Sequence, residues 1–147
     1  MENPLQTAEE YLHKGKLMQL ATVHNGKPWI CTVNYVHDQT HNLYWISMRN
    51  SRHSVELARE QTIAVAVVAD PITKQGLQME GTACEVTGAD VTRVHRLYAA
   101  KYEDKPERLA EARSSAPDKR AYYKFVPRSI KIVDITNAPG NPGQILL

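Results

Sequence analysis

Residues 17–37, LMQLATVHNGKPWICTVNYVH, decide the fold class of this chain. Residues 17–23 are predicted to form a β-strand, and the dipeptide Asn25-Gly26 supplies the positive φ angles of a two-residue hairpin turn. The chain then returns over residues 28–37, where successive side chains point to opposite faces. A long hairpin of this kind predicts an antiparallel sheet.

Further strand-like segments, bounded by turn residues, bring the expected total to about six strands. Residues 62–69, TIAVAVVA, are almost continuously apolar and β-branched, which predicts a strand covered on both faces. Gly81 and Pro127 fall inside two other strands, where glycine marks a bulge or a close approach and proline marks an edge or a bulge. The expected strands cover residues 17–23, 28–37, 43–48, 62–69, 77–87 and 122–135.

Short helices are expected at residues 8–14, 50–59, 91–102 and 106–114. Thr7 and Glu10 form a capping box for the first helix, Asn50-Ser51 caps the second, and Asp104 is the expected N-cap of the last. The order of elements favours an antiparallel sheet closed into a barrel, because closure removes exposed strand edges. We therefore predict a mainly β fold with peripheral helices, and a β-sandwich is the alternative.

Composition places the chain among globular proteins of one domain, residues 1–147. The hydrophobic fraction is 42%, the charged fraction 23% and the net charge only +2, which gives no reason to expect nucleic acid or a membrane as a partner. The first residues lack the cationic and apolar regions of a signal peptide. Cys31 and Cys84 have no metal-type spacing and are interpreted as buried, reduced thiols, so we expect a cytoplasmic protein.

The segment with the strongest chemical signal is LYWISMRNSRH, residues 43–53. It places the end of a strand, hydroxyl groups and cations at the start of a helix, where backbone amides favour an anion. Arg52 can donate two parallel hydrogen bonds to phosphate oxygens, and His53 or Arg49 can add another donor. From these residues alone, solvated side chains and a phosphate site are equally good interpretations.

Residues 21–57 resemble the flavin-binding split-barrel family typified by pyridoxamine 5′-phosphate oxidase. Ser51-Arg52-His53 matches the family's serine-arginine-lysine element, which opens a helix and holds the FMN phosphate, with histidine in place of lysine. Ile46-Ser47 matches the strand end that lines the flavin. The resemblance extends over about residues 17–135, and it implies an antiparallel split β-barrel with a Greek-key-like order.

Two further strands complete the set of residues that the resemblance implies. The strand of residues 31–34 matches the one whose backbone faces the isoalloxazine ring, and residues 77–83 resemble a later strand in which a glutamine approaches the flavin; Gln78 is preferred over Gln75 for that role. The residues implied to bind FMN are Thr32, Val33, Asn34, Ile46, Ser47, Arg49, Ser51, Arg52, His53 and Gln78.

The chain also departs from the family pattern. Pyridoxamine phosphate oxidases carry a basic arginine-histidine element near the C-terminus that binds the substrate phosphate, whereas residues 137–143 read NAPGNPG. The resemblance therefore implies FMN more strongly than vitamin B6 chemistry. We expect a flavin-dependent oxidoreductase acting with a small-molecule substrate or electron donor, and the alternative is a non-catalytic carrier of flavin, haem or another tetrapyrrole.

A homodimer is expected, with its interface forming part of the flavin pocket. The domain is small for a three-ring cofactor, ligand sites are common where surfaces meet, and members of the family usually bind FMN between two subunits. Trp29, Tyr35, Tyr98 and Tyr102 are candidate interface groups. For Trp29 and Tyr35 a place in the core is an equally good interpretation.

The remaining histidines give no metal site in this interpretation. His37 and His41 flank an expected hairpin turn, and a pair four residues apart suits a metal ion on a helix rather than a turn. We expect both of them to lie in a solvated loop. His13, on the first helix, and His24, in the first turn, receive the same interpretation.

Overall fold

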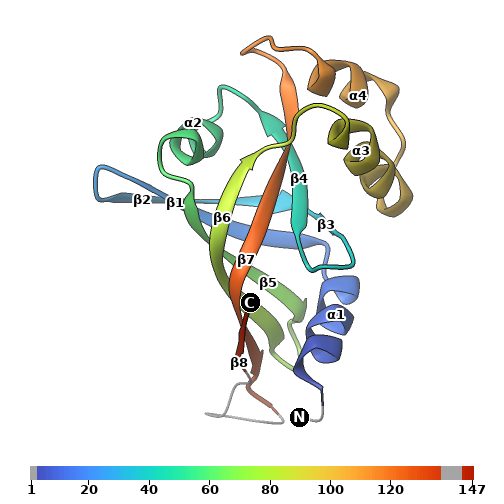
Figure 1. The fold of residues 1–147 in the computed structure, drawn as a ribbon. Coiled ribbons are helices and arrows are strands. Elements are labelled where there is room, and N and C mark those ends of the chain that lie inside the picture. Colours follow the sequence, from blue (N-terminus) through green and yellow to red (C-terminus); the bar gives the residue numbers. More distant parts are fainter. Residues whose placement is uncertain (1–2, 137–143) are drawn as a thin grey trace.

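Eight antiparallel strands form one strongly curled sheet in the computed structural model, which describes residues 3–136 and 144–147 (Figure 1). The predicted split β-barrel with peripheral helices is confirmed. Along the sheet the strands are β2 (Lys27–Asn34), β1 (Leu17–His24), β5 (Thr62–Asp70), β6 (Gln75–Glu85), β7 (Arg120–Asp134), β4 (Leu43–Met48) and β3 (Val36–His37), and β8 (Gln144–Leu146) pairs with β7.

The hairpin of β1 and β2 is as predicted. Asn25 and Gly26 have φ angles of 52° and 72°, and the register pairs Leu17 with Asn34. The predicted strand over residues 28–37 is instead two strands, because the chain changes partners at Tyr35. This break and the short β8 explain why the described part of the chain has eight strands rather than about six.

Tyr35 closes the barrel, because it joins strands at opposite edges of the sheet. β2 pairs with β1 at one edge and β3 pairs with β4 at the other. The Tyr35 side chain is fully buried, its hydroxyl donates to the Leu12 carbonyl oxygen (2.8 Å), and its backbone N–H donates to the Lys16 carbonyl oxygen (3.1 Å). One residue thus bridges the two edges, and the sheet has to curl to allow it.

Four helices lie around the sheet: α1 (Pro4–Lys14), α2 (Arg52–Arg59), α3 (Asp90–Lys101) and α4 (Pro106–Arg113) (Figure 1). Two predicted caps are wrong. Asn3, not Thr7, caps α1 by accepting a hydrogen bond from the Gln6 amide (3.2 Å), because Pro4 occupies the first helical position. Asp104 instead lies 3.1 Å from His95 Nε2, and α4 starts one residue later than the predicted cap implies.

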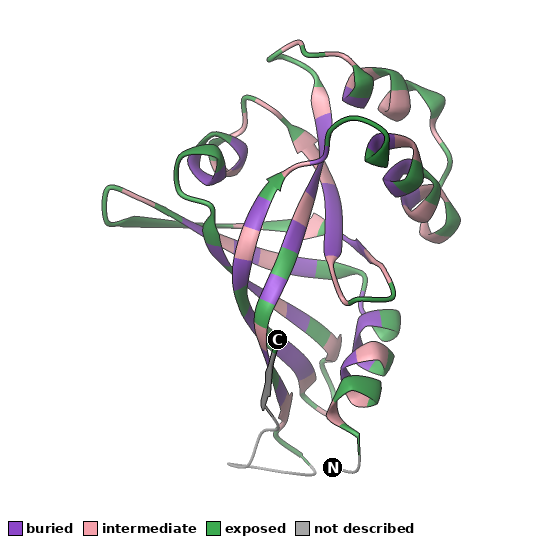
Figure 2. Cartoon of the chain, viewed as in Figure 1, coloured by how far each residue is buried: buried purple, intermediate pink, exposed green. Residues whose placement is uncertain are grey.

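Two hydrophobic cores occupy opposite faces of the sheet (Figure 2). The first fills the barrel and is closed by α1 and by Leu57 of α2. The second lies between α3, α4 and the outer face of β4 and β7, so alternate residues of β4, such as Tyr44 and Trp45, are fully buried on opposite faces. The second core consists of Val36, Tyr44, Val86, Val91, Val94, Tyr98, Ala112 and Tyr122.

β5 is covered on one face only, so the prediction that both faces are covered is wrong. Ile63, Val65 and Val67 point into the barrel, whereas Ala64 and Val68 are exposed. The physical reason is the position of α3 and α4, which cover β4 and β7 rather than β5. The outer face of β5 is therefore apolar without a covering element among the described residues.

The predicted irregularity at Gly81 and Pro127 is confirmed. The pairing of β6 with β7 changes from Glu80–Ser129 to Gly81–Pro127, which leaves Arg128 as the extra residue of a bulge. A Cβ atom at position 81 would collide with the carbonyl oxygen of Val126. Only glycine allows the two long strands to approach so closely here.

The two cysteines are free, and the prediction that both are buried holds only in part. Cys31 is half-buried, and burial raises the pKa of its thiol to about 11. Cys84 is exposed because it lies on the outer face of β6, between the barrel-facing Ala83 and the turn that follows.

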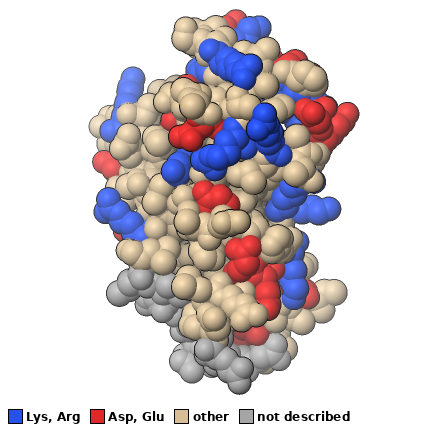
Figure 3. All heavy atoms as spheres, turned by 45° about the vertical axis from the view of Figure 1, so that its right-hand side comes forward, with Lys and Arg blue, Asp and Glu red and all other residues tan. Residues whose placement is uncertain are grey.

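Charged groups of both signs are interspersed over the face that carries α1, α3 and α4. Lys and Arg side chains are more numerous in the upper half of this face and Asp and Glu side chains lie among and below them (Figure 3). Among the described residues no helix combines the length and apolar character needed to cross a bilayer.

Candidate functional site

The turn between β4 and α2 leaves the start of the helix open. Ser51 is the N-cap residue, but its hydroxyl donates to the Met48 carbonyl oxygen (2.8 Å) rather than capping a helical amide. The first turn of α2 also contains no acidic residue. The first amides of an α-helix have no intrahelical acceptor and carry partial positive charge. This end of α2 can therefore accept an anion.

Hydroxyl groups and an imidazole surround that helix start. His53 Nε2 lies 2.8 Å from Ser47 Oγ and 3.4 Å from Ser51 Oγ, and Ser51 also hydrogen-bonds to the buried hydroxyl of Ser54 (2.8 Å). The sequence predicted three of these four residues and missed Ser54. Burial lowers the pKa of His53, and the nearby Glu56 opposes that change. In the absence of an anion the ring is therefore mostly neutral at pH 7.

Arg52 is held at the rim of this cluster by two neighbours. Its Nε donates to Glu56 (3.0 Å), and its Cζ lies 4.1 Å from the centre of the Trp29 ring. The guanidinium is half exposed, and within the described chain Nε makes its only hydrogen bond. Nη1 and Nη2 can therefore donate in parallel to an oxyanion. The Arg52–Glu56 spacing is readable from the sequence, whereas the stacking of Arg52 on Trp29 of β2 is a tertiary contact.

Arg49 has a different position from the one that the sequence predicted. Its side chain is largely buried, and its Nε donates to Glu85 (3.1 Å). The η nitrogens donate to carbonyl oxygens at and beyond the end of α4, at distances from 2.6 to 3.3 Å: Glu111, Ala112, Ser114 and Ala116. All five guanidinium N–H groups thus have acceptors. Arg49 therefore has no free donor for an anion at the start of α2.

The predicted flavin-lining residues of β2 lie on an edge strand. Val33 packs against the barrel core, and Thr32 and Asn34 face outward and are exposed. β2 lies beside β4 and α2, and in the described sheet only β1 pairs with it. Its second backbone edge can therefore receive polar groups of a ligand. Ile46 is partly buried against the second core.

Gln78 is exposed on β6 and lines a hollow with Ala66, Val68 and Pro71 that contains none of the residues at the start of α2. It shares a row with Thr32 on the outer face of the sheet, because Gln78 pairs with Ala66, Ala66 with Gln19, and Gln19 with Thr32. Three strand spacings separate Gln78 from Thr32, which is about 14 Å. Within one chain the structure therefore groups Ser47, Ser51, Arg52 and His53, and it places Gln78 apart.

Two of the four aromatic interface candidates, Tyr35 and Tyr98, belong to the core, and Tyr102 is partly buried against it. Tyr35 is fully buried, and Tyr98 is 5% exposed and packs against Tyr102 and Tyr122 with ring centres 4.8 and 5.7 Å away. The Tyr102 hydroxyl donates to the Tyr35 carbonyl oxygen (2.7 Å). Burial of Tyr35 in the barrel core is the alternative that the sequence left open. The interface prediction is wrong for Tyr98, because its ring packs between α3 and the sheet. Tyr102 is only partly buried, so its place in an interface stays a prediction. Trp29 remains 41% exposed.

A different apolar surface is open to solvent, on the outer face of the β2–β1–β5 part of the sheet. Leu17, Val23, Ile30 and Val68 are 51, 37, 62 and 51% exposed, respectively. The alternation of the strands places them all on this face, with the small residues Ala21, Ala64 and Ala66 between them. We call these seven residues the outer apolar face. The polar residues Gln19 and Thr32 lie among them on the same face. Exposed apolar surface of this kind is typical of an interaction site.

Comparisons with known proteins give a consistent result for the family and the fold. A family model described as pyridoxamine 5′-phosphate oxidase matches residues 5–134. No curated protein sequence matches the chain significantly. The solved structures described next are 15–20% identical to this chain and therefore show the fold alone.

Three of these structures illustrate the range of proteins with this fold. A protein of unknown function from Agrobacterium tumefaciens has a TM-score of 0.73 and 20% identity; the match covers 88% of this chain but only 56% of that protein. General Stress Protein 26 from Bacillus anthracis has a TM-score of 0.71 and 17% identity, with 97% of both chains covered. The heme storage protein HutZ from Vibrio cholerae has a TM-score of 0.70 and 15% identity, covering 99% of this chain and 95% of HutZ.

Proposed function

The chain belongs to the pyridoxamine 5′-phosphate oxidase family, and we propose that it binds FMN and acts as a flavin-dependent oxidoreductase on a small molecule. The observation that carries the proposal is the open start of α2, which has no side-chain cap and no acidic residue in its first turn. The Arg52 guanidinium, the His53 imidazole and several hydroxyls surround it, and this donor set suits a phosphate monoester.

The described residues fit the two ends of FMN differently. Ser47, Ser51, Arg52 and His53 would bind the phosphate. The backbone of residues 32–34 and the strand end at Ile46 would line the ring, with Gln78 supplied from elsewhere on the sheet. When bound, the flavin supplies the electron transfer, so these residues need only bind and orient it. Reduction of the holoprotein by NADH or NADPH, followed by a screen of electron acceptors, tests for turnover.

Arg52→Ala should weaken FMN binding by about 1.5–3 kcal/mol, the usual contribution of hydrogen bonds to a charged group. Riboflavin, which lacks the phosphate, should bind equally well to both proteins. Fluorescence titration of the flavin-free protein measures both affinities. Arg59→Ala is the matched control, because Arg59 is an exposed arginine at the other end of the same helix. Equal losses for FMN and riboflavin would show that Arg52 acts on the fold instead.

FMN affinity should fall as pH rises between about 5.5 and 8.5, a range that brackets the usual pKa of histidine. Burial lowers the pKa of His53 in the free protein, and a bound phosphate raises it, so binding is coupled to proton uptake by the ring. The phosphate itself ionises near pH 6, so the contribution of His53 is the difference between wild type and His53→Gln. His53→Lys should flatten the profile. Parallel pH profiles for wild type and His53→Gln would exclude His53 as a phosphate ligand.

Haem is the second candidate cofactor, because the heme storage protein HutZ shares the fold over nearly its whole length. The phosphate site distinguishes the two ligands, since haem carries carboxylates on an apolar macrocycle. Competition between haemin and FMN for the purified protein, followed by the Soret band and by flavin fluorescence, decides between them. Tight haemin binding with no FMN uptake would replace the FMN proposal.

We further propose that the protein is a homodimer, with the outer apolar face as part of its interface. This face adjoins the unpaired edge of β2, where the flavin-lining residues are proposed to lie. A second copy with the same surface would bury both faces together, as two-fold symmetry requires. It would also bring residues such as Gln78 of one copy toward the ring held by the other.

Ile30→Glu should raise the dimer dissociation constant by about two orders of magnitude, because burying an unpaired carboxylate costs several kcal/mol. Light scattering at micromolar concentrations should then report a monomer. Ile72→Glu is the control, since Ile72 is 88% exposed in the turn between β5 and β6. A monomeric wild-type protein with full FMN occupancy would contradict the dimer but not the phosphate site.

A further inference from the structure

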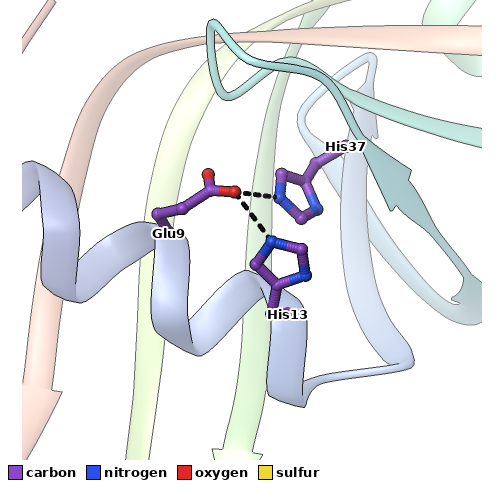
Figure 4. A group of neighbouring side chains, drawn as sticks. All are labelled: Glu9, His13 and His37. Atoms are coloured by element: carbon purple, nitrogen blue, oxygen red, sulfur yellow. Dashed lines mark hydrogen bonds and ion pairs between the residues drawn. The ribbon is translucent and has the colours of Figure 1, made fainter.

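Three histidines gather around Glu9 where α1 meets the turn that follows β3. Figure 4 shows two of them, His13 and His37, on either side of the Glu9 carboxylate. Glu9 Oε1 lies 3.1 Å from His13 Nε2 and 2.9 Å from His37 Nε2, and Glu9 Oε2 lies 3.6 Å from His41 Nε2. Glu9 and His13 are on successive turns of α1, so their side chains lie on one helix face.

Two of these histidines are not solvated, which corrects the prediction from the sequence. The side chains of His37 and His41 are 9% and 15% exposed, whereas that of His13 is 72% exposed. Because α1 packs over the turn, the rings of His37 and His41 are held beside Glu9 rather than in solvent.

The turn that carries His37 and His41 is itself well ordered. The Asp38 carboxylate accepts hydrogen bonds from the backbone amides of Thr40 (2.9 Å) and Asn42 (3.0 Å) and from the Tyr44 hydroxyl (2.8 Å). His41 has a φ angle of 66°, in the left-handed region that this tight turn requires. Both imidazoles therefore project from a fixed backbone, which reduces the ordering needed to bind a ligand.

We propose that Glu9, His13 and His37 form a site for a divalent transition-metal ion of the zinc class, with the fourth position open to water. In a tetrahedral zinc site the bonds to nitrogen and oxygen are about 2.0–2.2 Å, which places neighbouring donor atoms about 3.4 Å apart. The two separations from Glu9 Oε1, 2.9 and 3.1 Å, are slightly shorter than that value, and the donor atoms of Glu9, His13 and His37 all lie within 4.8 Å of one another. Small side-chain movements would convert these contacts into metal bonds.

The donor set and its surroundings also suit such an ion. Imidazole nitrogen with one carboxylate oxygen favours zinc-class metals over Mg²⁺ or Ca²⁺, which prefer oxygen. Glu9, His13 and His37 lie on the wall of a pocket of about 620 Å³, which provides an access route and room for a water ligand. A bound ion would join α1 to the turn after β3.

Titration of the untagged, chelator-treated full chain with Co²⁺ tests the site. We expect visible d–d absorption of a tetrahedral ion that saturates at one Co²⁺ per chain and is displaced by Zn²⁺. His13→Ala and His37→Ala should each lower the affinity at least about 100-fold, and Glu9→Gln, which keeps a hydrogen-bond acceptor, at least about tenfold. The flavin-free protein is used, so the outcome is independent of FMN binding.

His24→Ala is the matched control, because it removes an imidazole from the β1–β2 turn and should leave Co²⁺ binding unchanged. His13→Ala alters an exposed side chain, so this variant should remain folded even if His37→Ala does not. As a second measurement, Zn²⁺ should raise the Tm of the wild type but not that of His13→Ala. No saturable Co²⁺ signal, or equal affinities for His13→Ala and His24→Ala, would overturn the proposal.

Discussion

Arg49→Ala should lower the free energy of unfolding by about 3–5 kcal/mol, the range expected when one partner of a buried polar network is removed. The Arg49 guanidinium holds Glu85 of β6 and the carbonyl oxygens at the end of α4. Without it those acceptors lose their donors, and α4 loses its main polar link to the strand end that carries the proposed FMN site. Urea unfolding followed by circular dichroism measures the loss.

Two companion variants make this result specific. Arg49→Lys keeps the charge but not the planar fork, so its stability should lie between those of wild type and Arg49→Ala. Arg59→Ala, at an exposed position, should change the stability by less than about 0.5 kcal/mol. If Arg49→Ala were as stable as Arg59→Ala but bound FMN poorly, the result would show that Arg49 contributes to phosphate binding rather than to stability.

Gly81→Ala should destabilise the protein by about 3 kcal/mol, the upper end of the usual cost of overpacking. The added methyl group would collide with the Val126 carbonyl oxygen and would approach the Pro127 Cα to 2.8 Å. Backbone atoms cannot rotate away as a side chain can, so β6 and β7 would have to separate at the bulge. The midpoint and slope of a urea transition measure the effect.

Gly88→Ala provides the comparison for this substitution. Gly88 has a φ angle of 65°, but a Cβ atom there would meet nothing within 4 Å. The expected cost is about 1–2 kcal/mol, from the left-handed backbone alone. Equal losses for the two variants would mean that the strands have room at Gly81 and that the bulge is not tightly packed.

Much of the fold could be predicted from residues that determine the backbone conformation of their own neighbours in the sequence. Asn25-Gly26 sets its own turn geometry, and the glycine and proline inside β6 and β7 mark a bulge wherever those strands pair. The coverage of a strand is different, because it depends on where distant helices pack. An apolar run such as residues 62–69 is compatible with either one or two covered faces, and only the docking of α3 and α4 on β4 and β7 decides it.

In the candidate site, too, features set by neighbouring residues were predicted and features set by tertiary contacts were not. Ser51, Arg52 and His53 are adjacent in the sequence and lie together at the start of α2, as predicted. The acceptors of Arg49 lie 36 positions away at Glu85 and more than sixty positions away at the end of α4, so no local pattern could show that its donors are already engaged. The expectation that His37 and His41 are solvated failed for the same reason, since α1 and the turn after β3 meet only in the folded chain.

Barrel closure through Tyr35 costs little chain entropy. Bringing two free sheet edges together across a long loop carries a loop-closure cost that increases with the length of the loop. Here the strands at the two edges are separated by one residue, which is anchored through Leu12 and Lys16. Once β1 has paired with β5 and β4 with β7, closure requires little further ordering. Separation of β2 from β1 would then displace β3, and separation of β3 from β4 would displace β2. The two edges are therefore expected to unfold as one cooperative unit.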